Sequence, residues 1–223
     1  MSAPHKVVPM GSRLSTAGLR KRGLFAAGVA ACLANLPGRA MAGGQVEEPL
    51  IDSVRTALSA SVANTAPPKP VFANARSQQA YGGWLAEASE RLQRYIVNPL
   101  TRTEFLETLW YESKRAGLEP AIVLGIVQVE SAFRKYAISS AGARGYMQVM
   151  PFWARLIGDG VESRLFHMQT NLRFGCVIMR HYLDIERGDL FLALGRYNGS
   201  RGRSEYPNLV FAAQGRWDVP VSA

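Results

Sequence analysis

Residues 120–131 read Pro-Ala-Ile-Val-Leu-Gly-Ile-Val-Gln-Val-Glu-Ser and decide the expected fold. Between Ala121 and Val129 the only polar side chain is Gln128, and a helix that is apolar on nearly every side is normally buried. Glu130 stands at the end of this run. Because an unpaired buried charge is costly, a carboxyl group in such a place tends to keep its proton. A carboxyl group that is protonated near neutral pH is what a general acid requires.

The pattern around this helix predicts a mainly α domain. No segment shows the sustained two-residue alternation of a half-buried strand. Asn98-Pro99 is expected to end a preceding helical stripe, and Thr101 or Thr103 to cap the next helix. We predict helices over about 101–116, 119–131, 152–157, 168–186, 189–198 and 206–214.

The first 42 residues resemble an export signal. They hold six Lys and Arg residues and no Asp or Glu, and the apolar run 24–36 is too short to span a bilayer. Ala40-Met41-Ala42 is a small-x-small cleavage site. We therefore expect cleavage after Ala42 and a periplasmic or secreted protein. Lipidation at Cys32 and an uncleaved, membrane-retained helix stay open as alternatives.

Removing the signal changes the charge balance. The whole chain has 26 basic and 17 acidic residues, but the remainder after residue 42 has 20 and 17, a net charge of +3. A nucleic-acid-binding protein needs a clustered basic surface in its folded domain, so this class loses most of its support. A mildly basic chain still suits an anionic polymer such as the cell wall.

The predicted organisation has four parts. Residues 1–42 are the signal, and 43–99 form an N-terminal arm with a short amphipathic helix near residue 50 and a Pro-, Ser- and Ala-rich linker over 59–83. Residues 100–217 form the dense helical domain, and 218–223 a tail. The one cysteine after the signal, Cys176, is expected to be a buried small hydrophobe.

Among the acidic residues, Glu130 alone has apolar neighbours on both sides. Glu112-Ser113 repeats the Glu-Ser pair, but it lies beside charged residues and is expected to be exposed. The histidines after the signal, His167 and His181, are fourteen positions apart, without an HExxH motif or a cysteine pair. The nucleophile-elbow motif GxSxG is missing as well. We expect no metal and no cofactor.

Three segments, taken together and in order, resemble the three motifs of the soluble lytic transglycosylase (SLT) domain. They are Glu130-Ser131 followed by Phe133, the run Gly-Tyr-Met-Gln-Val-Met-Pro at 145–151, and Tyr197-Asn198-Gly199. The family usually has Leu in the second motif where this chain has Tyr146, and Ala in the third where it has Arg196. The resemblance covers about residues 100–215 and implies a lysozyme-like, mostly α fold that acts on peptidoglycan.

The resemblance also implies a mechanism with one carboxyl group. Most glycosidases use two carboxylates, whereas only Glu130 is well placed here. Glu130 would protonate the glycosidic oxygen between N-acetylmuramic acid and N-acetylglucosamine, while the N-acetyl group of the sugar stabilises the cation. The same residue would then take the proton of the muramoyl 6-hydroxyl, which closes a 1,6-anhydro ring without consuming water.

The motifs carry further implied roles. Tyr197 would hydrogen-bond the Glu130 region, and Asn198 and Gln148 would contact the glycan. The other residues assigned to substrate binding by position in the motifs are Ser131, Met147 and Tyr146. For Arg196 two interpretations stay open, contact with an anionic muramoyl group and simple exposure to solvent.

Two alternatives to a lytic transglycosylase remain. The first is a goose-type lysozyme-like peptidoglycan hydrolase, which would need a second carboxylate to position water, from Asp159 or Glu162. The second is a weakly catalytic wall-binding component of a secretion or conjugation system, with a partner docked on residues 43–99. A nucleic-acid-binding protein is a distant further option.

Overall fold

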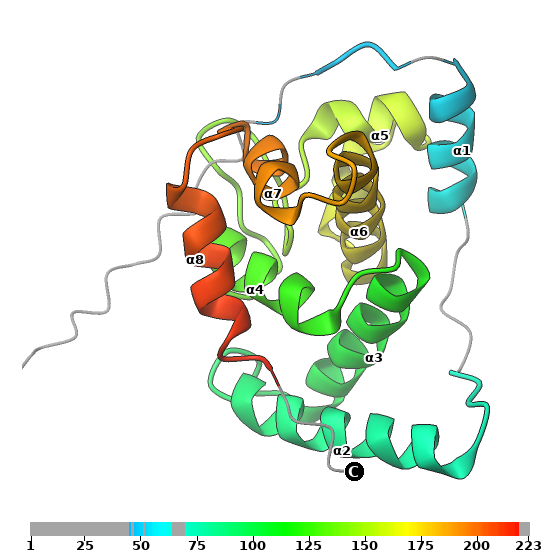
Figure 1. Ribbon diagram of the computed structural model, residues 1–223, viewed down its shortest axis with the longest axis vertical. Coiled ribbons are helices and arrows are strands. Elements are labelled where there is room, and N and C mark those ends of the chain that lie inside the picture. Colours follow the sequence, from blue (N-terminus) through cyan, green and yellow to red (C-terminus); the bar gives the residue numbers. More distant parts are fainter. Residues whose placement is uncertain (1–44, 46, 51, 64–69, 219–223) are drawn as a thin grey trace, which may run out of the picture. The chain divides into compact units, whose positions relative to one another are not determined.

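The computed structural model describes residues 45, 47–50, 52–63 and 70–218. The predicted export signal, its cleavage site, Cys32 and residues 219–223 of the tail lie outside the described residues. The described residues contain eight α-helices and one short 3-10 helix over Glu162–Phe166 (Figure 1). The α-helices are α1 Asp52–Val62, α2 Ala75–Leu92, α3 Pro99–Arg115, α4 Pro120–Ser131, α5 Pro151–Ile157, α6 Met168–Ile185, α7 Leu190–Asn198 and α8 Glu205–Gln214.

The prediction of a mainly α fold is confirmed. Within the described ranges the only β pairing consists of isolated bridges of Ile138 with Arg144 and of Arg144 with Val149. These bridges lie in the loop between α4 and α5. That loop carries the second motif, so the irregular part of the fold and the candidate site coincide.

Helix α4 lies in the core, as the run 120–131 predicted. Its residues from Ile122 to Val127 are buried, and it packs most extensively against α8. Gly125 permits this close approach, because a Cβ atom there would lie 3.0 Å from the carbonyl oxygen of Val210. The lack of a side chain at Gly125 therefore allows the backbone of α8 to lie close to α4.

The start of α3 differs from the prediction. Asn98-Pro99 begins this helix instead of ending the preceding one, which stops at Leu92. The side chain of Asn98 accepts a hydrogen bond from the backbone N–H of Thr101 at 3.0 Å, and Pro99 occupies the first helical position. Proline is tolerated there because its missing N–H has no partner within the helix in any case.

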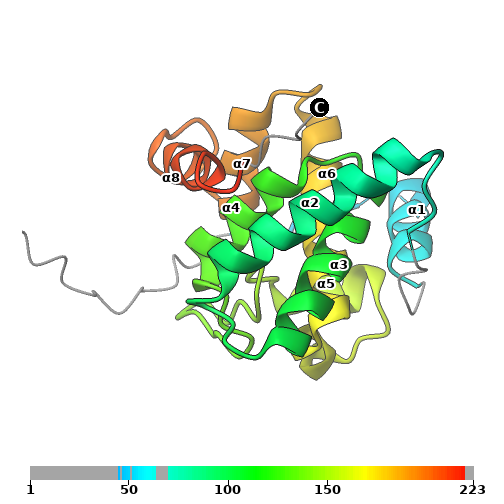
Figure 2. The same cartoon turned by 90° about the horizontal axis from the view of Figure 1, so that it is seen from below.

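Helix α1 ends and helix α2 begins inside the segment 59–83 predicted as a linker, so that prediction is wrong for residues 59–62 and 75–83. Asn74 and Ser77 form a capping box at its start. Trp84 and Leu92 are buried on one face of the helix, which packs against α3 (Figure 2). Packing of this apolar face outweighs the low helix propensity of the Ser and Gly residues nearby.

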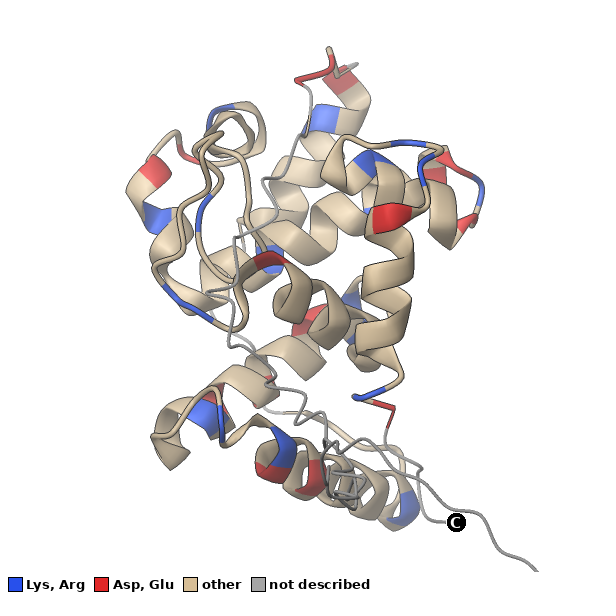
Figure 3. Cartoon of the chain, turned by 90° about the vertical axis from the view of Figure 1, so that its left-hand side faces the viewer, with Lys and Arg blue, Asp and Glu red and all other residues tan. Residues whose placement is uncertain are grey.

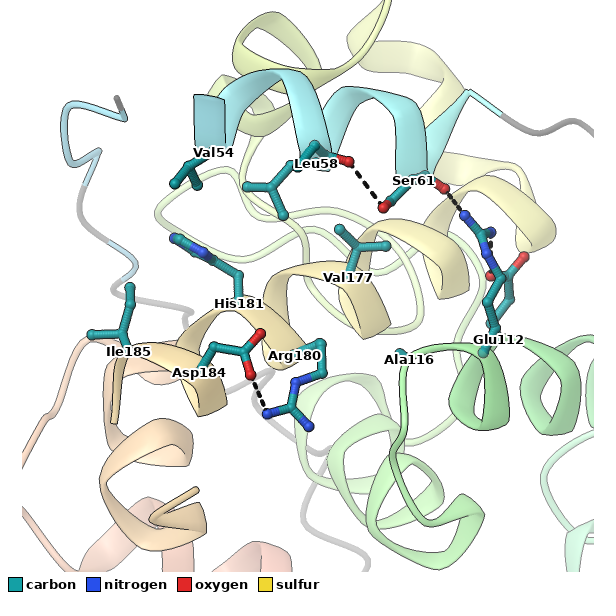
Figure 4. A pocket seen from close by; sticks show the side chains of 12 residues that line it. Val54, Leu58, Ser61, Glu112, Ala116, Val177, Arg180, His181, Asp184 and Ile185 are labelled. Carbon is teal, nitrogen blue, oxygen red and sulfur yellow. Dashed lines mark hydrogen bonds and ion pairs between the residues drawn. The ribbon is translucent and has the colours of Figure 1, made fainter. Parts of the chain in front are cut away.

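Helix α1 packs against α5 and α6, although none of its residues is fully buried. Arg115 of α3 donates a hydrogen bond to the carbonyl oxygen of Ser61 at its end. Between α1, α3 and α6 lies a largely apolar cavity of about 540 Å³, with Leu58 and Val177 on facing walls (Figure 4). The arm helix is therefore attached to the helical core by a few contacts around a gap.

Glu112 is buried, which contradicts its predicted exposure. Its carboxylate pairs with Arg173 of α6 at 2.8 Å and with Arg115 at 3.2 Å. Other arginines are paired similarly, and Lys and Arg positions are interspersed with Asp and Glu positions on the side shown in Figure 3. The local sequence around Glu112 gave no sign of Arg173, which lies 61 positions further along the chain.

Candidate active site

Glu130 lies in the last turn of α4 and is 0 % exposed. The hydroxyl of Tyr206, in the first turn of α8, donates a hydrogen bond to its Oε1 at 2.6 Å. Burial raises the pKa of Glu130 to about 8, and the hydrogen bond from Tyr206 lowers it by less. Burial also raises the pKa of Tyr206 well above its ordinary value. Both groups are therefore protonated at neutral pH.

The hydrogen bond from Tyr206 determines which oxygen of Glu130 carries the proton. Because Oε1 accepts the phenolic hydrogen, the proton of the neutral carboxyl group belongs on Oε2. Oε2 is buried and has no hydrogen-bond partner among the described residues. A buried polar group without a partner calls for an explanation, and an unused acidic hydrogen is what a general acid offers to a ligand.

Ser131 connects the end of α4 to the second motif. Its hydroxyl lies 2.7 Å from the carbonyl oxygen of Tyr146 and 3.1 Å from that of Val127. Directly after the helix, Ala132 and Phe133 have positive φ angles of 49° and 61°, so the chain turns sharply away from the helix axis. Ser131 thus positions the loop next to Glu130.

Asn171 of α6 holds the second motif in place. Its Oδ1 accepts a hydrogen bond from the backbone N–H of Met147 at 2.8 Å, and its Nδ2 donates to the carbonyl oxygens of Arg144 and Leu165 at 2.8 and 2.7 Å. Gly145 has a φ angle of +77°, and a Cβ atom there would lie 2.4 Å from Nδ2 of Asn171. The glycine of the motif is therefore required both by the backbone turn and by this close approach.

Gln148 is buried with a positive φ angle of 49°. Its Nε2 donates hydrogen bonds to the carbonyl oxygens of Gly145 at 2.9 Å and Ala137 at 3.1 Å. Its Oε1 has no partner among the residues that the structure describes. A non-glycine residue in this region of φ is strained, and such strain is concentrated at functional sites. Gln148 presents a fixed acceptor that lacks a donor.

Tyr197 lies near Glu130, but its hydrogen bond goes elsewhere. Its hydroxyl donates to the carbonyl oxygen of Met147 at 2.8 Å. Burial, followed by the charge of Glu130, raises its pKa well above the ordinary value. The donor to Glu130 is instead Tyr206, which lies outside the three motifs. Tyr206 and Val210 share the apolar face of α8. Because a buried phenolic hydroxyl usually has a hydrogen-bond partner, this tyrosine on an apolar face is the feature of the sequence that could have pointed to the contact.

The remaining predicted residues divide into packing and surface positions. Met147 is fully buried, and Tyr146 packs on Phe105 with ring centroids 4.9 Å apart. Asn198, at the end of α7, is partly exposed and accepts a hydrogen bond from the Ser200 hydroxyl at 3.0 Å. The chain therefore gathers the three motifs around Glu130, with Tyr146 and Met147 facing the core.

The charged residues considered for glycan binding or water activation all form ion pairs. Arg196 pairs with Glu186 at 2.8 Å and with Glu48 at 2.9 Å, so it is not simply exposed to solvent. Asp159 pairs with Arg164. Glu162 bridges two arginines, Arg144 at 2.9 Å and Arg155 at 2.5 Å. Ion pairs of this kind leave neither Asp159 nor Glu162 as a free carboxylate.

The fold and this site define a mainly α-helical domain built around one buried acid. Residues 108–214 match the family model described as "Transglycosylase SLT domain", so this part of the chain is an SLT domain.

Curated relatives carry corresponding names. A membrane-bound lytic murein transglycosylase C from Actinobacillus pleuropneumoniae is 38 % identical over 84 residues, which cover 34 % of this chain and 23 % of that protein. One from Histophilus somni is 44 % identical over 127 residues, covering 50 % and 32 %. The transglycosylase of Enterobacteria phage PRD1 is 31 % identical over 103 residues, covering 46 % and 37 %. The chain thus spans about a quarter to a third of the length of these relatives.

Among solved structures, an inactive mutant of the lytic transglycosylase Slt from Pseudomonas aeruginosa aligns with a TM-score of 0.41 and 18 % identity, covering 76 % of this chain and 36 % of that one. In the described part of the chain, no helix combines the length and apolarity needed to cross a bilayer.

Proposed function

We propose that this protein is a peptidoglycan lytic transglycosylase that cleaves the β-1,4 bond between N-acetylmuramic acid and N-acetylglucosamine. The observation that carries the proposal is the neutral, fully buried carboxyl group of Glu130, with Oε1 engaged by Tyr206 and Oε2 unengaged among the described residues. The names of the relatives, lytic murein transglycosylase and transglycosylase, support the same reaction.

The first step is transfer of the Oε2 proton of Glu130 to the glycosidic oxygen, as the bond from that oxygen to C1 of the muramoyl residue breaks. The N-acetyl carbonyl of the same sugar stabilises the positive charge that develops at C1. Glu130 becomes a carboxylate, and the hydrogen bond from Tyr206 stabilises that charged form. Gln148 Oε1 is an acceptor for a donor group of the bound glycan.

In the second step the muramoyl 6-hydroxyl oxygen attacks C1 and its proton passes to Glu130 Oε2. This step closes the 1,6-anhydro ring and restores the acid. Water takes no part, so a second carboxylate is not required. The engagement of Asp159 and Glu162 with arginines supports this route over hydrolysis, which would need one of them to activate water.

The decisive experiment is mass spectrometry of the fragments released from purified cell-wall sacculi. A transglycosylase leaves anhydro ends that lack one water relative to the reducing ends that a hydrolase leaves. Glu130→Gln should abolish release, since a general acid typically contributes about 10²–10⁴-fold in rate. The matched control is Asp159→Asn, which should retain it. Reducing ends, or lysis by Glu130→Gln, contradict the proposal.

The domain organisation and location are part of the proposal. Residues 100–217 would be the catalytic domain, 43–99 a supporting arm, and 1–42 a signal removed after Ala42 during export to the cell envelope. The name "membrane-bound" in the relatives supports the envelope location, and the packing of α1 and α2 on the core supports the role of the arm. N-terminal sequencing of exported protein tests the cleavage site. A pull-down with and without residues 43–99 tests whether the arm binds a secretion-system or wall-machinery partner.

A further inference from the structure

Gln45 precedes the SLT domain in sequence, yet its side chain is buried against that domain. It is 5 % exposed, and its Oε1 accepts a hydrogen bond from the indole Nε1 of Trp153 at 2.9 Å. The two residues are 108 positions apart. A residue near the start of the described chain thus reaches a tryptophan of α5.

The indole N–H of Trp153 has its hydrogen-bond acceptor outside the SLT domain. The ring is 3 % exposed and lies edge-on to Tyr182 and His181, with centroid separations of 6.2 and 6.3 Å. A buried indole N–H normally has an acceptor. Among the described residues that acceptor is Gln45, from outside the range 108–214.

This contact adjoins the candidate active site. Tyr182, which lies edge-on to Trp153, also lies edge-on to Tyr197, with ring centroids 6.5 Å apart. Through Trp153, Gln45 thus contacts a cluster of rings that includes Tyr197. A second contact follows three residues later, where Glu48 pairs with Arg196 at 2.9 Å, next to Tyr197 in the chain. Two side chains of the N-terminal arm therefore contact Trp153 and Arg196, one linked to Tyr197 through the ring of Tyr182 and the other next to Tyr197 in the chain.

We propose that the indole N–H of Trp153 is part of a subsite for the acetamido group of a glycan, and that the carboxamide of Gln45 occupies this subsite in the free protein. This inference rests on the proposed function. The side chain of Gln45 ends in a carbonyl and an amide N–H, the same groups that an N-acetyl sugar presents. The indole N–H of Trp153 would donate to either carbonyl in the same way.

The fit of Gln45 is incomplete, as expected for an occupant that is displaced. Its Nε2 is buried without a hydrogen-bond partner among the described residues. An unpaired buried donor reduces the stability of the occupied state. The ion pair of Glu48 with Arg196 supplies the second attachment, and its side chains are only partly buried. A glycan would have to break both contacts, so each should lower the apparent affinity for substrate.

The test measures binding of chitotetraose and of its de-acetylated counterpart by calorimetry, in a Glu130→Gln background that prevents turnover. Gln45→Ala should bind the acetylated tetramer about ten-fold more tightly, the effect of one competing hydrogen bond. Its affinity for the de-acetylated tetramer should not change. Trp153→Phe, which keeps a ring but removes the N–H, should lose most of the preference for the acetylated form, with thermal unfolding as the check on its fold.

The two adjacent glutamates provide a matched control. Glu48→Gln should tighten binding because it removes the pair with Arg196, whereas Glu47→Gln, at an exposed position, should have no effect. Equal affinities of the parent and Gln45→Ala for the acetylated tetramer, or an unchanged acetyl preference in Trp153→Phe, overturn the subsite. Failure of the proposed function would appear separately, as absence of wall lysis by the chain that retains Glu130.

Discussion

Replacement of Glu130 by Gln should stabilise the protein increasingly as pH rises, while it removes activity. In the folded chain burial raises the pKa of Glu130 from 4.5 to about 8. Between these two values the folded state holds a proton that the unfolded state has released, so the wild-type protein loses stability as pH rises through this window. Below both values the effect vanishes. Glutamine does not titrate and lacks this dependence.

The magnitude follows from the same window. Each pH unit between the two pKa values corresponds to about 1.4 kcal/mol. From pH 5 to pH 7 the free energy of unfolding of Glu130→Gln, relative to wild type, should therefore rise by about 2–3 kcal/mol. All other titrating groups cancel in this difference. The side-chain oxygen of the glutamine can still accept the hydrogen bond from Tyr206, so the comparison retains that contact.

Urea unfolding of the two proteins at pH 5, 6 and 7 measures the effect. The control is Glu162→Gln, at a partly exposed carboxylate paired with Arg144 and Arg155. It should show no comparable increase over this range. If the difference between Glu130→Gln and wild type stays constant with pH, the carboxyl group is not held neutral by burial, and the assignment of Glu130 as a neutral general acid is refuted.

Three further predictions concern the contacts around this acid. Tyr206→Phe removes the hydrogen bond that lowers the pKa of Glu130 and stabilises its carboxylate. The alkaline limb of the pH–rate profile should therefore shift to higher pH, while the maximal rate of wall lysis falls about ten-fold. An unchanged profile would exclude a role for this hydroxyl. Gly125→Ala places a Cβ atom 3.0 Å from the backbone of α8 and should lower the free energy of unfolding, measured in urea, by about 1–3 kcal/mol. An unaltered unfolding midpoint would show that α8 can shift away from α4 at no cost in stability. Asn171→Ala leaves the Met147 N–H without its acceptor and should lower the free energy of unfolding by about 2–4 kcal/mol, with loss of lysis. Retained stability and lysis would mean that the loop of the second motif keeps its conformation without Asn171.

Much of the fold was determined by the sequence alone. The run 120–131 is apolar on nearly every side, so it had to be buried, and Glu130 at its end had to be a buried acid. Pro151 at a first helical position and Asp189 as a cap also follow from local chemistry, and the structure has both. The start of α3 shows the limit of this reasoning. Asn98-Pro99 can end one helix or begin another, and only packing decides between the two.

The tertiary structure alone decided which partners complete the site. Tyr206 reaches Glu130 across 76 positions, Asn171 reaches Met147 across 24, and Gln45 reaches Trp153 across 108. A local pattern indicates which face of a helix is apolar, because that depends on residues three or four positions apart. It does not indicate which polar group of another helix meets that face. That choice depends on how closely the helices pack, as at Gly125, and it determines where the proton of Glu130 resides.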